Sequence, residues 1–222
     1  MMSQTPVAGT EIGYPDLADC TEESRAALLT RGQLHTFAPG DVLFTEGEPA
    51  GVMLLLLEGN VQLNKATARG RRQVLCDATP SRCGGVCMMF LNDPALATLR
   101  AASDGKALTV NVADFQELAL NDPALMAATW AGATSCLRHM SSLVERLSFR
   151  KVSERIALAL LDNTQENGEL VRWTQAELAA EVGTTREVVA RCLGGFQTCG
   201  AVRLGRGRVT VLSRQALMDE MK

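Results

Sequence analysis

The sequence predicts an α+β protein: an N-terminal β-roll or jelly roll, a long central helix, and a C-terminal winged helix-turn-helix. Three observations predict this order. Short apolar runs broken by glycine turns fill the first half, a heptad pattern of apolar residues follows, and a capped helix pair precedes two short strands near the C-terminus. We expect three parts, residues 1–120, 121–149 and 150–222.

The composition allows substantial cores and predicts no membrane span. The chain has 222 residues, 46% of them hydrophobic, yet no run of apolar residues is long enough to cross a bilayer. Residues 1–14 are polar and lack a charged start followed by an apolar run, so no secretory signal is expected. Seven cysteines, an odd number, then argue against a disulfide scaffold. These features predict a cytoplasmic protein.

Charge is unevenly distributed along the chain. Residues 150–222 carry 11 Lys and Arg against 9 Asp and Glu, whereas residues 1–149 carry 11 against 16. A mildly basic C-terminal part behind an acidic body is compatible with nucleic-acid binding but does not diagnose it.

The β-roll prediction depends on short apolar runs at regular spacing. Glycine turns follow several of them, as at Gly47 and Gly59. Many short strands separated in this way favour a sandwich or barrel. The expected strands are Val42–Phe44, Val52–Leu57, Val61–Leu63, Val74–Leu75 and Leu108–Val112.

A long helix is expected to begin near Asn121, because Asp122 can cap it and Pro123 suits its first turn. Its apolar residues are spaced alternately by four and three, which is a heptad seam. The seam residues are Met126, Trp130, Ala133, Leu137, Met140, Val144 and Leu147. A helix packed on its own barrel needs a wider apolar stripe, so the narrow seam favours a parallel homodimer.

The helix-turn-helix prediction starts at Thr174, which can cap a helix over Gln175–Val182, with Glu177 completing a capping box. Gly183 supplies the turn, and a second helix follows from Thr185. The apolar positions of this second helix recur at i, i+4 and i+7 and should pack on the core. They are Val189, Leu193 and Phe196.

The opposite face of the second helix carries Arg186, Glu187 and Arg191, with the small residues Ala190 and Gly194 between them. At helical spacing these positions spread over about 140°. Arginine can donate two hydrogen bonds to guanine, and glutamate can accept from cytosine, so this face is suited to the major groove. A solvated charged face is the alternative, but it does not explain the turn pattern that precedes it.

Residues 201–211 predict two strands around a glycine turn, which would form the wing. Arg203, Arg206 and Arg208 lie on it and can contact phosphates. The residues that we expect to contact double-stranded DNA are Arg186, Glu187, Arg191, Thr174, Gln175, Thr185, Arg206 and Arg208.

Taken together, these patterns resemble the CRP/FNR family of bacterial regulators over nearly the whole chain. The glycines Gly40, Gly47 and Gly59 resemble those of its cyclic-nucleotide-binding-type β-roll, and residues 153–157 resemble the entry to its DNA-binding domain. The resemblance implies a dimerisation helix, a palindromic operator with TGTGA-like half-sites, and contact with RNA polymerase.

The effector region departs from that family. The cAMP-responsive members hold the nucleotide with a Gly-Glu pair and a later Arg-Ser pair. Residues 83–87 of this chain contain no glutamate, residues 94–99 contain no Arg-Ser, and Arg100 is displaced. We therefore expect no cAMP. Cys20 stands alone near the N-terminus, which argues against the family's iron–sulfur cluster.

Cys76, Cys83 and Cys87 fall within 12 residues, in the part of the barrel where relatives of this kind bind effectors. Thiolates can bind a soft metal or metalloid ion, or be oxidised to a disulfide or polysulfide bridge. We predict a thiol sensor here, with simple packing as the alternative. The spacing matches no common zinc site, so it does not identify the ligand.

Other functions are less favoured by the sequence. Haem would have only His35 and His139, or a cysteine, as iron ligands, and a small organic ligand or the absence of any effector stays open. An enzyme is disfavoured because the chain has no CxxC pair and no glycine-rich phosphate loop.

Overall fold

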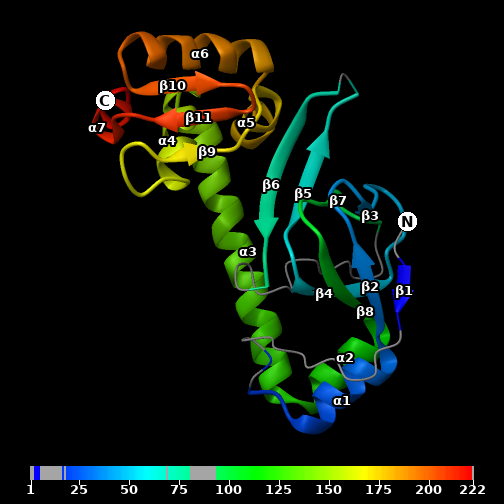
Figure 1. The fold of residues 1–222 in the computed structure, drawn as a ribbon. Helices are drawn as coiled ribbons and strands as arrows, with labels where there is room; N and C mark the ends of the chain where they lie inside the picture. Colours follow the sequence, from blue (N-terminus) through cyan, green and yellow to red (C-terminus); the bar gives the residue numbers. More distant parts are fainter. Residues whose placement is uncertain (1–2, 6–16, 18, 69, 81–93, 222) are drawn as a thin grey trace. The chain divides into compact units, whose positions relative to one another are not determined.

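A computed structural model of the chain describes residues 3–5, 17, 19–68, 70–80 and 94–221 (Figure 1). Its contacts divide into two units, the first made of Met1–Lys65 and Cys76–Met140, the second of Ala66–Leu75 and Ser141–Lys222. Sheets dominate the first unit and short helices the second, so the predicted α+β class is confirmed.

Two four-stranded sheets form the β-roll. The first has the order β1 (Ser3–Thr5), β2 (Gln33–Phe37), β8 (Gly105–Asn111) and β4 (Val52–Glu58). The second has the order β3 (Val42–Phe44), β7 (Thr98–Ala101), β5 (Val61–Ala66) and β6 (Arg72–Ala78).

The position of strand β4 between two buried clusters explains why its sequence is an unbroken apolar run. Leu54 and Leu56 pack with Leu99 of the second sheet in one buried cluster. Met53 and Leu55, which point to the other face of a pleated strand, belong to a separate cluster with helical residues. Both faces are buried, so no polar residue alternates with the apolar ones.

The helices on that other face, α1 (Glu22–Arg31) and α2 (Val112–Asn121), were not predicted. Strand β8 was expected to run through Val112 but ends at Asn111, whose Oδ1 accepts a 2.9 Å hydrogen bond from the Ala113 amide and caps α2. Because Asn111 is both the last residue of β8 and the cap of α2, the apolar Val112 that follows it is easily mistaken for one more strand residue.

Helix α3 (Pro123–Phe149) begins where the sequence predicted, after an Asp122 cap. Asp122 Oδ1 accepts from the Ala124 amide at 3.0 Å, and Oδ2 accepts from the Thr21 amide at 2.9 Å. Hydrogen bonds from Ser24, then Thr21, hold the pKa of Asp122 well below its usual range. One carboxylate thus joins the starts of α1 and α3.

The second unit contains α4 (Val152–Asp162), β9 (Leu170–Val171), α5 (Gln175–Val182), α6 (Arg186–Thr198), β10 (Val202–Gly205), β11 (Arg208–Val211) and α7 (Arg214–Asp219). Its sheet has the order β10-β11-β9, and one apolar core joins sheet and helices. Within the described part of the chain, no helix has the length and apolar character needed to cross a membrane.

Candidate nucleic-acid interface

Helix α5 starts as its sequence predicted. Thr174 Oγ1 accepts from the Glu177 amide at 3.2 Å, and Glu177 Oε2 accepts from the Thr174 amide at 2.7 Å, so the capping box is complete. The amides of the first helical residues, Gln175 and Ala176, come too early for an intrahelical partner. They can therefore donate to an anion such as a DNA phosphate.

The turn between α5 and α6 requires glycine at position 183. Gly183 is left-handed, with φ 69°, and it is buried. A Cβ added there would also lie 3.0 Å from a Leu147 methyl group. The predicted turn is confirmed, and the left-handed conformation is its physical reason.

Partners for this turn come from residues 66–75, which belong to the same unit. The Arg71 guanidinium donates to the Gly183 carbonyl, and Gln73 Nε2 donates to the Glu181 carbonyl at 3.2 Å. Sequence analysis assigned neither residue to the helix-turn-helix, because nothing local connects positions more than 100 residues apart.

Helix α6 separates its two faces as expected. Val189, Leu193 and Phe196 are at most 2% exposed, in the core of the unit. Arg186, Glu187 and Arg191 are exposed. Their face of α6 is therefore free for a ligand.

The charges on that face are in the form that base contact needs. Hydrogen bonds from the backbone amide of Glu187 itself, and then from the Thr185 hydroxyl, lower the pKa of the Glu187 carboxyl. This carboxylate is therefore an ionised acceptor at neutral pH. None of the ion pairs formed among the described residues involves Arg186, Arg191 or the wing arginines.

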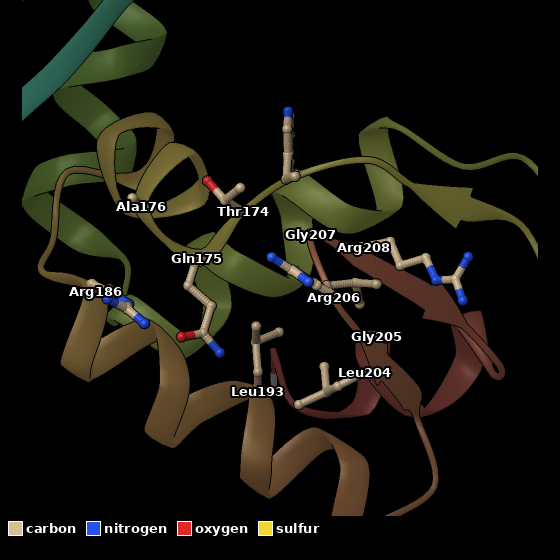
Figure 2. Close-up of a pocket in the computed structure, with 12 residues that line it drawn as sticks. Thr174, Gln175, Ala176, Arg186, Leu193, Leu204, Gly205, Arg206, Gly207 and Arg208 are labelled. Carbon is tan, nitrogen blue, oxygen red and sulfur yellow. The ribbon is translucent and has the colours of Figure 1, made fainter.

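A groove of about 510 Å³ lies between α5, α6 and the wing. Figure 2 shows Thr174 and Gln175 at the start of α5, Arg186 at the start of α6, and Arg206 and Arg208 on the wing. These five of the predicted contact residues line one concave surface. The others, Thr185, Glu187 and Arg191, do not line it, although all three are exposed. Trp173, Leu204 and Gly207 also line it and were not predicted.

Two glycines inside α6 have no structural reason among the residues that the structure describes. Gly194 lies at the centre of the charged face, and Gly195 follows it. A Cβ added to either would meet nothing within 4 Å. Glycine inside a helix costs up to about 1 kcal/mol relative to alanine. The missing side chains are thus not explained by packing in this protein.

The predicted seam of α3 is largely uncovered. Trp130, Leu137 and Val144 are 66%, 77% and 62% exposed, and Leu147 is also exposed. Met126, Ala133 and Met140 are half-buried. The fully buried residues of α3 form a different set, which includes Leu125, Ala128 and Leu143, although the seam residue Met126 also packs against that core. Among the residues that the structure describes, the seam is an apolar stripe that stays mostly exposed in one chain.

The predicted effector residues are only partly described. Cys76 is buried on β6, and its thiol donates to the Asp77 carbonyl at 3.6 Å. Cys83 and Cys87 lie outside the described residues. Within the described part of the chain, no three Cys, His, Asp or Glu side chains are grouped closely enough to hold a metal ion.

The two histidines have different surroundings. His35 is buried on β2, its Nε2 lies 2.9 Å from Thr109 Oγ1, and burial lowers the pKa of its imidazole. His139 is half-buried on α3.

A capped first helix, a glycine turn, an exposed charged second helix and an arginine-bearing wing define a winged helix-turn-helix DNA-binding module. Comparison with known families agrees. The cyclic nucleotide-binding domain family matches residues 34–122, and the Crp-like helix-turn-helix domain family matches residues 154–220.

Similar proteins align with this chain over most of their length. The cyclic AMP receptor protein of Thermus thermophilus is 28% identical over 210 residues, 94% of this chain and 97% of that protein. A CRP-like cAMP-activated global transcriptional regulator of Mycobacterium tuberculosis is 27% identical over 196 residues, 85% of this chain and 87% of that protein.

Among solved structures, the c-di-GMP responsive regulator CLP of Xanthomonas campestris aligns with a TM-score of 0.77. It is 21% identical, and the alignment covers 87% of this chain and all of that one. This likeness concerns the fold. The chain belongs to the CRP/FNR family of bacterial transcription regulators, and it is a regulator rather than an enzyme.

Proposed function

We propose that this regulator is a homodimer that binds a palindromic operator with TGTGA-like half-sites and is switched by thiol chemistry in its β-roll. The observation that carries the DNA-binding part is the exposed face of α6. Arg186, Glu187 and Arg191 are exposed and have no ion-pair partner among the described residues, and Arg186 also lines the groove that the wing completes.

The division of labour between residues follows from their positions. Side chains on α6 can reach base edges and would determine sequence. The α5 N-terminus and the exposed arginines Arg206 and Arg208 can bind phosphates, which would orient the module without selecting a sequence.

The exposed seam of α3 supports the homodimer, because a stripe of this size costs free energy in water and is complementary to itself. Parallel pairing would relate two modules by a twofold axis, and a palindrome has the same symmetry. Half-sites about 34 Å apart would then lie in successive major grooves. RNA polymerase is the second macromolecular partner that the family implies.

Operator binding can be tested by titrating a fluorescent palindromic duplex with two TGTGA-like half-sites. We expect much tighter binding to it than to a duplex with one scrambled half-site, or to one with five base pairs inserted between the half-sites. Equal affinity for all three duplexes would contradict base-specific binding by a twofold dimer.

Cys76 supports the thiol switch because its side chain points into the interior of the β-roll with Val74 and Ala78. Oxidation of two thiols to a disulfide would release two protons and two electrons, which the oxidant takes up. A soft metal ion would instead displace thiol protons without changing the oxidation state of sulfur. Either event would change packing inside the roll.

We propose that cAMP is not the effector, although relatives are named for it. Arg100 lies on β7 on the face opposite to Leu99 and Ala101, which are in the core. Its guanidinium donates to the Gly40 carbonyl at 2.5 Å. The arginine nearest to the expected position is therefore turned away from the roll interior, where a phosphate would need it.

The switch is tested by measuring operator affinity of the reduced protein, and again after treatment with an oxidant, polysulfide or a soft metal ion. Cys76→Ser, Cys83→Ser and Cys87→Ser should abolish the response, whereas Cys199→Ser, at an exposed position after α6, should keep it. If the treated and reduced proteins bind alike, the cysteines pack only, and haem or an organic ligand becomes the next hypothesis.

A further inference from the structure

Beside the start of α3 lies an apolar pocket of about 300 Å³ that the proposed function does not use. Helix α2 supplies most of its wall, and α3 and β4 supply the rest. The lining residues are Met53, Val112, Phe115, Gln116, Ala119, Leu120, Met126 and Thr129. All of them belong to the first unit.

Two of these residues also have a place in the heptad. With Trp130 at position a, Met126 is the preceding d and Thr129 the preceding g. In a parallel pair, a residue at a inserts between four residues of the facing helix: the preceding d and g, the a itself, and the following d. For Trp130 those four are Met126, Thr129, Trp130 and Ala133.

The hole that would receive the partner's Trp130 therefore opens into the pocket. An ordinary a hole suits a branched aliphatic side chain, and an indole is too large for it. Here the α3 wall is continued by α2 and β4, and about 300 Å³ is free. Ala133 leaves further room because it follows Trp130 at d.

We propose that the pocket is the receptor for Trp130 of a second copy of this chain. Met126, which is half-buried, belongs both to the seam and to the pocket lining, and it joins the exposed Trp130 of the seam to a pocket that the exposed Leu120 also lines. Gln116, one turn before Leu120 on α2, also lines the pocket; it is exposed and can accept the indole N–H, which needs an acceptor when it is buried. The inference rests on the proposed homodimer.

This arrangement has a consequence for the dimer. The partner's indole would contact α2, which packs on β4 and β8 of the roll. Each subunit would then hold the other by its β-roll as well as by α3. Such an anchor at one end of the seam would also fix the register of the two helices.

The test compares two exposed leucines of the same unit. Leu120, 77% exposed, lines the pocket, and Leu96, 73% exposed, does not. Dimer dissociation is measured by sedimentation for Leu120→Ala, Leu96→Ala, Trp130→Ala and the double variant Leu120→Ala with Trp130→Ala. We expect Trp130→Ala to weaken the dimer at least tenfold and Leu120→Ala several-fold, with no further loss from Leu120→Ala once Trp130 is absent. Leu96→Ala should have no effect.

A second measurement follows the indole directly. In a Trp173→Phe background Trp130 is the only tryptophan. Its emission should shift to the blue as dimers form, and Leu120→Ala should reduce the shift. A dimer in which Leu120→Ala and Leu96→Ala behave alike, or in which Trp130 emits as in water, overturns the pocket and leaves the homodimer intact.

Two further outcomes also overturn the proposal. Protein that stays monomeric at every concentration removes both the homodimer and the pocket assignment. A blue shift that does not depend on protein concentration but disappears after solvent extraction identifies a small apolar ligand as the occupant.

Discussion

Helices α6 and α3 have the same kind of sequence and opposite surroundings. Both carry apolar residues at alternating spacings of three and four. In α6 this stripe is at most 2% exposed, packed in the core of the second unit, and the charged face is outside. In α3 the stripe that includes Trp130 and Leu137 is outside, and the chain buries other residues of the helix.

The difference shows that a periodic stripe indicates a partner but does not identify it. The module around α6 has enough helices and strands to cover its own stripe. Helix α3 buries a different face against its own unit and leaves most of its seam exposed. Each helix therefore presents one exposed surface, charged on α6 and apolar on α3, and we propose DNA and a second copy of the chain as their respective partners.

The largest expected effect is the difference in the free energy of unfolding between Leu193→Ala and Leu137→Ala. Leu193→Ala removes a fully buried side chain and should lower the free energy of unfolding by about 2–5 kcal/mol. Leu137→Ala changes an exposed residue and should alter the unfolding of the monomer by no more than about 0.5 kcal/mol. Urea unfolding at low protein concentration measures both.

The same pair separates folding from assembly. Unfolding of the native protein should depend on protein concentration, and Leu137→Ala should remove that dependence. If Leu137→Ala destabilised the monomer as strongly as Leu193→Ala, the seam would be packed within the chain and the contrast between the helices would be lost.

Arg191→Ala tests the charged face. It should cost about 1–3 kcal/mol on the palindromic operator and much less on random DNA, because it removes contact with bases. Arg206→Ala, on the wing, should weaken both DNAs equally. Fluorescence anisotropy titrations measure the four affinities; equal losses for Arg191→Ala on both DNAs would mean that Arg191 contacts phosphate only.

Gly194→Ala tests the centre of that face. It should stabilise the protein by up to about 1 kcal/mol, because alanine favours the helix and its methyl group meets nothing within the chain. It should nonetheless weaken operator binding, since the methyl group would stand between α6 and the base edges. Gly195→Ala, about 100° further around the helix, is the control and should keep operator affinity. Unaltered binding by Gly194→Ala would refute the close approach.

The smallest effect is a pH dependence from His35 in the β-roll. Burial lowers the pKa of this imidazole below its ordinary value of 6.5, so the unfolded chain binds a proton that the folded one does not. The contribution of His35 to the free energy of unfolding should be fully present above pH 6.5. It should decrease as the pH falls toward the lower pKa that His35 has in the folded protein. Urea unfolding between about pH 5 and 8 should show this slope in the native protein but not in His35→Gln. A slope of opposite sign would mean that folding favours the imidazolium.

The sequence predicted the second unit better than the first. The capping box at Thr174, the Gly183 turn and the stripe of α6 are local patterns, and local hydrogen bonds and φ angles determine them. The sequence predicted neither α1 nor α2. Helix α2 follows β8 without a loop, and its packing partners Met53 and Leu55 lie far away in the chain. The links from Arg71 and Gln73 to the turn were missed for the same reason of distance.

By itself, the sequence determined the class of this protein: a sheet-rich first part, a long helix with a heptad seam, and a winged helix-turn-helix with a charged face. Periodicity, caps and turn residues act over a few positions and can be recognised without the fold. Only the tertiary structure decided which apolar stripe is covered. It also brought Gln175, Arg186 and Arg206 to one groove and formed the pocket beside Trp130. Burial and concavity depend on residues distant in the sequence, whose proximity the folded chain alone creates.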